Sequence, residues 1–186
     1  MKAIATELPG MLLLEPQVFG DTRGFFMETW QAARYREAGM PERFVQDNHS
    51  RSRRGVLRGL HYQLTQPQGK LVWVTRGAVF DVGVDIRRGS PNFGRWYGCV
   101  LDDLNHRQLY IPPGFAHGFC VLSEEADFFY KCTDYYHPSS ERGIAWDDPE
   151  IGIAWPLRDG IALSAKDQHN GPLAVQRPED LPVYEG

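Results

Sequence analysis

Three basic side chains lie in the stretch VLRGLHYQLTQPQGK (residues 56–70), which otherwise resembles interior β-strands. His61 carries a ring whose unperturbed pKa lies near neutral pH, so it can accept and return a proton. Arg58 and Lys70 carry positive charges that can bind an anion. The alternative is a solvated rim, because a lysine and a histidine on one concave face more often face water than form a catalytic pair.

The residues around these groups predict a β-hairpin. We expect a strand over residues 57–63, a turn through residues 65–69, which contain Pro and Gly, and a returning strand over residues 70–74. The simplest register pairs Gln63 with Lys70.

That register predicts which side chains share a face. His61 would lie opposite Val72, and residues two apart on a strand point the same way. His61, Gln63 and Lys70 would therefore face one side of the hairpin, while Trp73 faces the other.

Arg58 is three residues from His61, so regular pleating would place the two on opposite faces. Gly59 lies between them and could host a bulge that returns Arg58 to the side of His61. The alternative is an arginine that reaches solvent from an edge strand. Geometry alone favours neither.

Short β-type runs dominate the rest of the chain and predict an all-β fold. They are rich in Val, Ile, Tyr and Phe, are punctuated by Gly, Pro and Asn, and cover residues 70–86, 95–101, 107–113, 117–122 and 127–136. Antiparallel strands in this number usually close as a double-sheet jelly roll with a cavity at one end.

One helix and an irregular tail complete the expected elements. TWQAARYREAG (29–39) predicts the main helix, with Thr29 as its cap and Gly39 at its end. The tail after Trp155 is rich in Pro, Gly and Asp, so we expect loops and short helical turns packed on the barrel. No linker or repeat interrupts the pattern, which predicts one domain over residues 1–186.

Length and composition set the class of protein. The chain has 186 residues, 42% of them hydrophobic and 24% charged, which suffices for a core without staples. The net charge of −4 argues against a surface that coats nucleic acid. The three cysteines show no CxxC spacing and are expected to be reduced thiols. The apolar run Met11–Leu14 is too short for a membrane span, so we expect a cytoplasmic protein.

Several stretches, taken together, resemble one family. IPPGFAHGFCVLSEEADFFYKCTDYY (111–136) is similar to the nucleotide-sugar epimerases of L-rhamnose synthesis, the dTDP-4-dehydrorhamnose 3,5-epimerase family. Further matches follow in the same order along nearly the whole chain, at residues 20–30, 45–52, 55–63, 69–96, 146–156 and 163–168. The family belongs to the cupins, so the resemblance implies a cupin jelly-roll barrel with a few short helices.

The resemblance also bears on metal binding. Many cupins hold a metal through a His-x-His pair, a glutamate and a distant histidine. Here His61 is present, but Gln63 stands at the second histidine and Gln68 at the glutamate, while His117 remains. Two histidines without a third strong ligand make a poor site for zinc or iron. We therefore expect no metal, and His61 is left free to act as a base.

Epimerisation removes a proton from one face of a carbon and returns one to the other, next to a carbonyl that stabilises the enolate. The resemblance implies His61 as the base, with Asp167 holding its ring. It implies Tyr130 as the acid on the opposite face and Lys70 at the carbonyl oxygen. From the residues alone, Asp167 would be a surface aspartate in a turn and Tyr130 a core aromatic.

The resemblance supplies the substrate contacts as well. It implies that Tyr136 stacks on the thymine ring and that an arginine of the 20–24 arm meets the pyrophosphate. The full set of implied binding residues is Arg23, Glu28, Gln46, Asp47, Asn48, Arg58, Lys70, His117, Tyr136, Glu141 and Lys166. No P-loop or dinucleotide-binding pattern occurs, and proton transfer needs no nicotinamide cofactor. We expect a dTDP-keto-sugar substrate and no cofactor.

In this family the N-terminal segment crosses to a second subunit, so the resemblance implies a strand-exchanging homodimer. The segment MLLLEPQVFG (11–20) is apolar enough to be an added strand.

Three other functions remain open at this stage. A relative within the class would invert only C3 or only C5, although Tyr130 favours the double epimerase. A non-catalytic cupin would bind a nucleotide sugar without turning it over. A metal-dependent oxygenase is disfavoured by Gln63 and Gln68.

Overall fold

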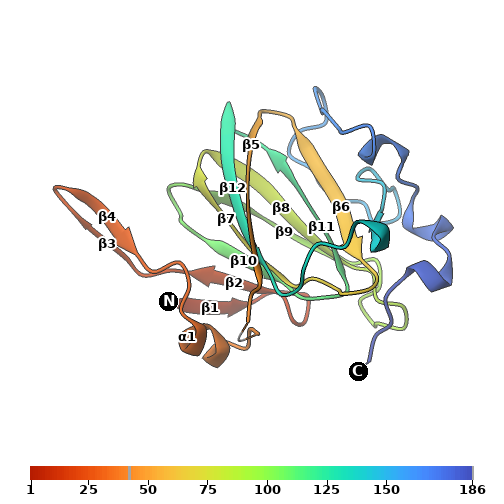
Figure 1. Cartoon of the computed structure of the whole chain (residues 1–186). Helices are drawn as coiled ribbons and strands as arrows, with labels where there is room; N and C mark the ends of the chain where they lie inside the picture. Colours follow the sequence, from red (N-terminus) through yellow and green to blue (C-terminus); the bar gives the residue numbers. More distant parts are fainter. Residues whose placement is uncertain (42, 186) are drawn as a thin grey trace.

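The computed structural model describes residues 1–41 and 43–185. Most of the regular structure is β-strand, arranged as two facing antiparallel sheets and a projecting ribbon (Figure 1). The six-stranded sheet has the order β1 (Lys2–Ala5), β2 (Leu12–Glu15), β10 (Gln108–Ile111), β7 (Lys70–Arg76), β12 (Glu125–Cys132) and β5 (Gln46–Arg53). The five-stranded sheet has the order β13 (Glu141–Gly143), β6 (Leu57–Gln63), β11 (Phe115–Val121), β8 (Ala78–Asp85) and β9 (Trp96–Asp102).

The predicted hairpin over residues 57–74 is wrong. Strand β6 pairs with β11 and β13, whereas β7 pairs with β10 and β12 in the other sheet. Residues 64–69 therefore cross from one sheet to the other, and Gln63 lies opposite Glu141 rather than Lys70. Strand propensity marks which residues are extended but does not say which sheet receives them. The crossing places β6 and β7 on opposite walls of the interior.

Of the two alternatives for Arg58, the structure shows the bulge at Gly59. His117 pairs with His61, but Phe119 pairs with Arg58, so β6 has one residue more than β11 over this stretch. Gly59 has a φ of 131°, which L side chains rarely adopt, and a Cβ there would lie 2.5 Å from the Cα of Gly118. Only glycine fits this position.

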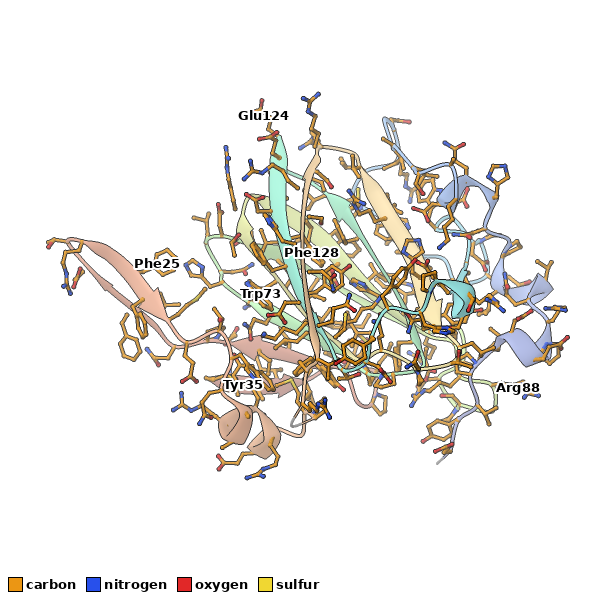
Figure 2. All side chains as sticks on the ribbon, viewed as in Figure 1. Phe25, Tyr35, Trp73, Arg88, Glu124 and Phe128 are labelled. Carbon is orange, nitrogen blue, oxygen red and sulfur yellow. The ribbon has the colours of Figure 1, made fainter. Side chains whose placement is uncertain are left out.

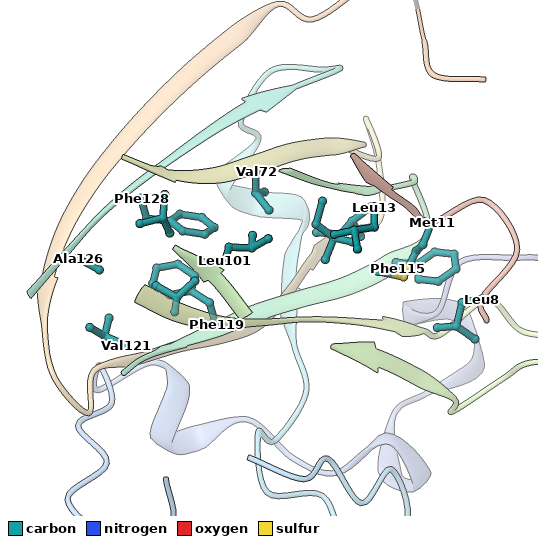
Figure 3. Packing of buried hydrophobic residues seen from close by; sticks show 14 residues of the cluster. Leu8, Met11, Leu13, Val72, Leu101, Phe115, Phe119, Val121, Ala126 and Phe128 are labelled. Atoms are coloured by element: carbon teal, nitrogen blue, oxygen red, sulfur yellow. The ribbon is translucent and has the colours of Figure 1, made fainter. Parts of the chain in front are cut away.

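The interior between the sheets is largely apolar. Figure 3 shows the cluster, in which Val72 and Phe128 of the six-stranded sheet meet Phe119 and Leu101 of the five-stranded one. Such packing is the main stabilising contribution of a two-sheet fold.

Trp73 lies on the other side of β7, as the alternation along the strand predicts. It packs with Leu14, Tyr35 and Tyr110 in a cluster outside the six-stranded sheet, where α1 covers the surface (Figure 2). The side chain is 9% exposed, and it stacks on Phe129 at a centroid distance of 6.0 Å. Its role is to attach the helical segment to the sheet.

The helix is shorter than predicted. α1 spans Ala32–Glu37, and its cap is Gln31, whose side chain accepts a hydrogen bond from the Arg34 amide at 2.6 Å. The prediction of Thr29 as the cap is therefore wrong. Gly39 follows the helix with a φ of 91°, which agrees with its predicted place at the end.

The C-terminal tail forms loops and short turns, as expected. Its 3-10 turns are η2 (Asp167–His169), η3 (Leu173–Val175) and η4 (Pro178–Asp180), and a further turn, η1 (Pro138–Ser140), precedes β13. Side chains of the tail cover the outer face of the five-stranded sheet, where Leu173 and Leu181 pack against Leu60 and Val84. This packing brings η2 beside β6.

The ribbon of β3 (Val18–Asp21) and β4 (Gly24–Met27) extends away from both sheets (Figure 1). Phe19, Phe25 and Phe26 on this ribbon are 61%, 61% and 70% exposed. Within residues 1–41 and 43–185, no helix is long and apolar enough to cross a membrane.

Candidate active site

A cavity of about 430 Å³ opens between the two sheets. Its polar walls come from both sheets and from the tail, and Phe119 and Phe128 form part of its apolar lining. A second hollow of about 350 Å³ shares three residues with it, so the two are parts of one trough. The shared residues are His61, Lys70 and Tyr130.

His61 and Asp167 form a close pair at the edge of the cavity. Nε2 of His61 lies 2.5 Å from Oδ1 of Asp167, and the aspartate is buried. Burial alone would raise the pKa of Asp167, but hydrogen bonds from His61, Ser164 and the Gly59 amide outweigh it and hold that pKa below its ordinary value. The carboxylate therefore stays charged and fixes the orientation of the imidazole.

Lys70 begins β7 on the wall opposite His61. Among the described residues its ammonium has no hydrogen-bond or ion-pair partner, and it lines both hollows. Burial lowers the pKa of Lys70, although the nearby Cys132, Glu141 and Asp81 oppose that shift. An unpartnered ammonium in an enclosed cavity is well suited to an anionic or carbonyl oxygen of a ligand.

Tyr130 lies on β12 of the six-stranded sheet, whereas His61 lies on β6 of the five-stranded sheet. Both side chains line the trough between the sheets. Burial raises the pKa of Tyr130, so the phenol keeps its proton at neutral pH and can donate it. The imidazole and the phenol thus come from opposite walls.

Tyr136 lies four residues beyond the end of β12, yet it lines the second hollow together with Tyr130. Its hydroxyl donates to Oε2 of Glu141 at 2.6 Å, and that hydrogen bond raises the pKa of Tyr136 to about 12. Lys166 forms an ion pair with the same carboxylate. The residue is 51% exposed, so its aromatic ring is accessible to a ligand.

Gln46 and Asn48 also line the second hollow, where Nε2 of Gln46 donates to Oδ1 of Asn48 at 3.0 Å. Asp47 lies between them on β5, so its side chain points to the other face of the sheet. There it forms an ion pair with Lys131 at 2.9 Å. The structure brings the two amides to the trough but not this carboxylate.

Arg58 reaches the cavity through the bulge at Gly59 and is held by Ser52, whose Oγ lies 3.1 Å from Nη2 of the arginine. His117 enters the same cavity from β11, and its Nε2 lies 3.0 Å from Oδ2 of Asp81.

Besides Asp47, the predicted binding residues Arg23 and Glu28 also lie outside the trough of this chain. Arg23 is at the tip of the projecting ribbon, where its guanidinium binds Asp21 and its side chain is 88% exposed. Glu28 pairs with Arg34 at 2.7 Å, near α1. Their predicted roles require a ligand that reaches beyond one chain.

The side chains of Gln63 and Gln68, which were considered above for metal binding, form hydrogen bonds with the backbone. Nε2 of Gln63 donates to the carbonyls of Gln66 and Tyr135, and Nε2 of Gln68 donates to that of Asp134. Within the described part of the chain, no group of three or more His, Cys, Asp and Glu side chains could hold a metal ion.

Sequence reasoning missed three residues that support the site: Ser52, Asp81 and Ser164. Asp81 had a detectable signal, because it is a carboxylate inside the apolar strand AVFDVGVD, whose last residue is a second aspartate, Asp85. A buried charge in such a strand requires a partner. The two serines carried no comparable signal, since serine is ordinary at exposed strand and turn positions.

Known proteins match both the sequence and the fold. The sequence profile of dTDP-4-dehydrorhamnose 3,5-epimerase matches residues 5–174. A dTDP-4-dehydrorhamnose 3,5-epimerase of Pseudomonas aeruginosa is 58% identical over 94% of this chain and 97% of its own length. One of Methanothermobacter thermautotrophicus is 52% identical over 97% of this chain and 96% of its own length.

A solved structure gives the same result. The dTDP-6-deoxy-D-glucose-3,5-epimerase of Legionella pneumophila, crystallised in complex with dTDP-4-keto-L-rhamnose, is 55% identical and superposes with a TM-score of 0.97 over 100% of this chain and 99% of that one. Together with the trough and its His–Asp pair, these matches assign the chain to the dTDP-4-dehydrorhamnose 3,5-epimerase family.

Proposed function

We propose that the protein is an isomerase that converts dTDP-4-dehydro-6-deoxy-α-D-glucose into dTDP-4-dehydro-β-L-rhamnose, the precursor of dTDP-L-rhamnose. The family assignment and the relatives of that name, 58% and 52% identical, support the activity. The observation that carries the proposal is the trough, in which His61 and Tyr130 come from facing sheets and Lys70 has no partner within residues 1–41 and 43–185.

The reaction requires proton removal and return at the two carbons beside the C4 ketone. His61 takes the proton from one face, and Asp167 stabilises the imidazolium that forms. The electrons of the broken C–H bond move onto the ketone oxygen, and Tyr130 delivers a proton to the opposite face of the carbon. Because one ketone activates both C3 and C5, a single base can serve both inversions.

Lys70 stabilises the enolate. Its ammonium has no competing partner among the described residues, so it can hold the ketone oxygen as negative charge develops there. A preorganised donor at such an oxygen contributes roughly 3–4 kcal/mol in comparable sites. Proton transfer of this kind changes no oxidation state, so we propose catalysis without metal or cofactor.

The second hollow is the proposed nucleotide end of the trough. The exposed face of Tyr136 would stack on thymine, and Gln46 and Asn48 offer the donors and acceptors that its edge requires. Glu141 and Lys166 would hold this end in place, while Arg58 and His117 would contact the sugar and its phosphates.

We also propose that two chains, each a single cupin jelly-roll domain, form a homodimer. Three phenylalanines on the ribbon are exposed, and their apolar surface is best explained by a second copy of the chain. Ribbon exchange would carry Arg23 and Glu28 to the partner's trough. The three free thiols agree with a cytoplasmic location.

Turnover in deuterium oxide tests the function. The protein is incubated with the keto-sugar, and deuterium is scored separately at C3 and C5 by NMR. Incorporation at both carbons supports the double epimerase, and an inactive wild type contradicts the proposal. Incorporation at C3 alone would support the second candidate, because a dTDP-4-dehydrorhamnose 3-epimerase of Streptomyces niveus is 42% identical over 95% of this chain.

A variant separates catalysis from binding. His61→Ala should abolish deuterium incorporation while titration calorimetry shows that affinity for dTDP is kept. A His61→Ala variant with wild-type turnover would exclude His61 as the base.

A further inference from the structure

The cavity contains a second histidine–aspartate pair, besides His61 and Asp167. Both carboxylate oxygens of Asp81 lie within hydrogen-bond distance of Nε2 of His117, at 3.1 and 3.0 Å. Asp81 is fully buried on β8, and His117 is 7% exposed on the neighbouring strand β11. Both histidines lie on the five-stranded sheet, but Asp81 belongs to a strand of that sheet, whereas Asp167 belongs to η2 of the tail.

The two nitrogens of His117 have different surroundings. A carboxylate only accepts hydrogen bonds, so the nitrogen facing Asp81 carries the proton. The other nitrogen, Nδ1, has no hydrogen-bond partner among the described residues. Within that part of the chain, Nδ2 of Asn170 is the one side-chain nitrogen or oxygen that is both sealed from solvent and unpaired. Nδ1 of His117 therefore reaches the cavity that the residue lines.

The burial of His117 favours its neutral form. Burial lowers the pKa of His117, and Lys70 and His61 add to that shift, whereas Asp81 opposes it. The imidazole of His117 also stacks on the ring of Phe128, with the two centroids 6.2 Å apart, and this contact restricts its orientation. A neutral ring with one nitrogen bonded to Asp81 presents a lone pair to the cavity, not a proton.

We propose that Asp81 is a positioning residue, which holds His117 as the Nε2–H tautomer so that Nδ1 accepts a hydrogen bond from a hydroxyl group of the bound sugar. The proposal rests on the proposed function for the identity of that ligand. The two histidine–aspartate pairs then have different roles. His61 exchanges protons with a carbon of the sugar, whereas His117 orients the sugar ring and transfers no proton.

The first test reads the tautomer directly in the wild-type protein without substrate. In ¹⁵N-labelled protein at neutral pH, two-bond ¹⁵N–¹H correlations distinguish the two neutral tautomers and the imidazolium. The peaks of His117 are those missing from His117→Gln. We expect the Nε2–H tautomer. An Nδ1–H tautomer or an imidazolium would overturn the proposal, and this measurement needs no variant of Asp81 that folds.

The second test compares two buried aspartates of β8. Asp81→Asn replaces an acceptor-only group with one that can also donate, so the Nδ1–H tautomer becomes populated. We expect kcat/KM to fall about tenfold to a hundredfold, the usual cost of losing such an outer partner. Asp85→Asn is the control, because Asp85 is equally buried but binds Arg87 and Ser90 away from the cavity.

The outcomes are distinct. Asp81→Asn with an altered tautomer and reduced kcat/KM, beside an Asp85→Asn that keeps both, supports the proposal. Wild-type kinetics in Asp81→Asn, a loss of activity without a change of tautomer, or an equal loss in Asp85→Asn each overturn it. An inactive wild type that shows the Nε2–H tautomer contradicts the proposed function and leaves the assignment to Asp81 standing.

Discussion

The two faces of the five-stranded sheet differ in what they bury. The outer face, beneath the C-terminal tail, is apolar: Leu60, Val82, Val84, Ala116 and Cys120 pack there. Alternate residues of the same strands point to the inner face, which carries polar side chains among its apolar ones. Those polar groups are His61, Asp81, Asp85 and His117.

The two faces of the sheet therefore have different functions: the outer face supplies apolar burial, and the inner face carries the polar groups of the candidate site. In an ordinary two-sheet protein, the space between the sheets supplies most of the apolar burial. Here the tail adds a second core on the outside of one sheet, so the inner face can accommodate polar groups without losing the apolar contacts that keep the sheet folded. The tail contributes twice, because η2 also carries Asp167 to His61.

The largest expected effect concerns the inner face. Asp167→Asn should lower kcat about 10⁴-fold, because an amide can stabilise the wrong tautomer of His61, as in the corresponding change in serine proteases. Steady-state kinetics measures the loss, and circular dichroism should show an unchanged fold. A kcat within tenfold of wild type would mean that His61 does not depend on this carboxylate.

The next effect concerns the outer face. Ile86→Ala, at a fully buried position of the tail-covered cluster, should cost about 2–5 kcal/mol of unfolding free energy through lost burial and the cavity left behind. Chemical denaturation measures the cost. The kcat of the folded fraction should remain that of the wild type, and a parallel loss of kcat would show that the two faces are not independent.

The smallest expected effect on stability is an increase rather than a loss, and it concerns Lys70. Lys70→Met replaces an enclosed ammonium, which has no partner among the described residues, with an apolar side chain of similar length. The Tm of the variant should therefore be a few degrees higher than that of the wild type. Its kcat should be lower by a factor of roughly 10²–10³. Thermal unfolding and kinetics measure both. A lower Tm would mean that the charge is compensated in the folded protein.

The pH dependence of this difference has a definite sign. The pKa of Lys70 is lower in the folded protein than its ordinary 10.5, so between these values the unfolded chain binds more protons. The free energy of unfolding of the wild type should therefore rise with pH, relative to Lys70→Met, through that window. A relative fall would contradict the lowered pKa.

The positions of the strands could be predicted from the sequence better than the pairing between strands. Residues 70–86 form two strands, β7 and β8, which lie in different sheets, and the hairpin expected over residues 57–74 spans both sheets. Local pattern determines that a residue is extended and which way it points. The pairing depends on contacts between residues far apart in the chain, which no local pattern contains.

Those features of the site that depend on one strand could be predicted from the sequence, whereas contacts between distant residues could not. The spacing of Arg58 and His61 left two alternatives open, a bulge at Gly59 or an arginine facing solvent, and the structure shows the bulge. Asp167 could be placed beside His61 only through the family resemblance, since 106 residues separate them. The roles of all the predicted site residues stay predictions. The side chains of Arg23, Glu28 and Asp47 in addition lie outside the trough of one chain.

Glycines at positions 59 and 118 set how closely β6 and β11 approach. A Cβ at Gly118 would lie 2.7 Å from the carbonyl oxygen of Arg58, and one at Gly59 would meet the backbone of Gly118 at 2.5 Å. The separation of the two imidazoles is thus fixed by main chain against main chain. Protein engineers who want the enzyme to accept a bulkier hexose should therefore trim Phe119 or Phe128 and leave both glycines untouched.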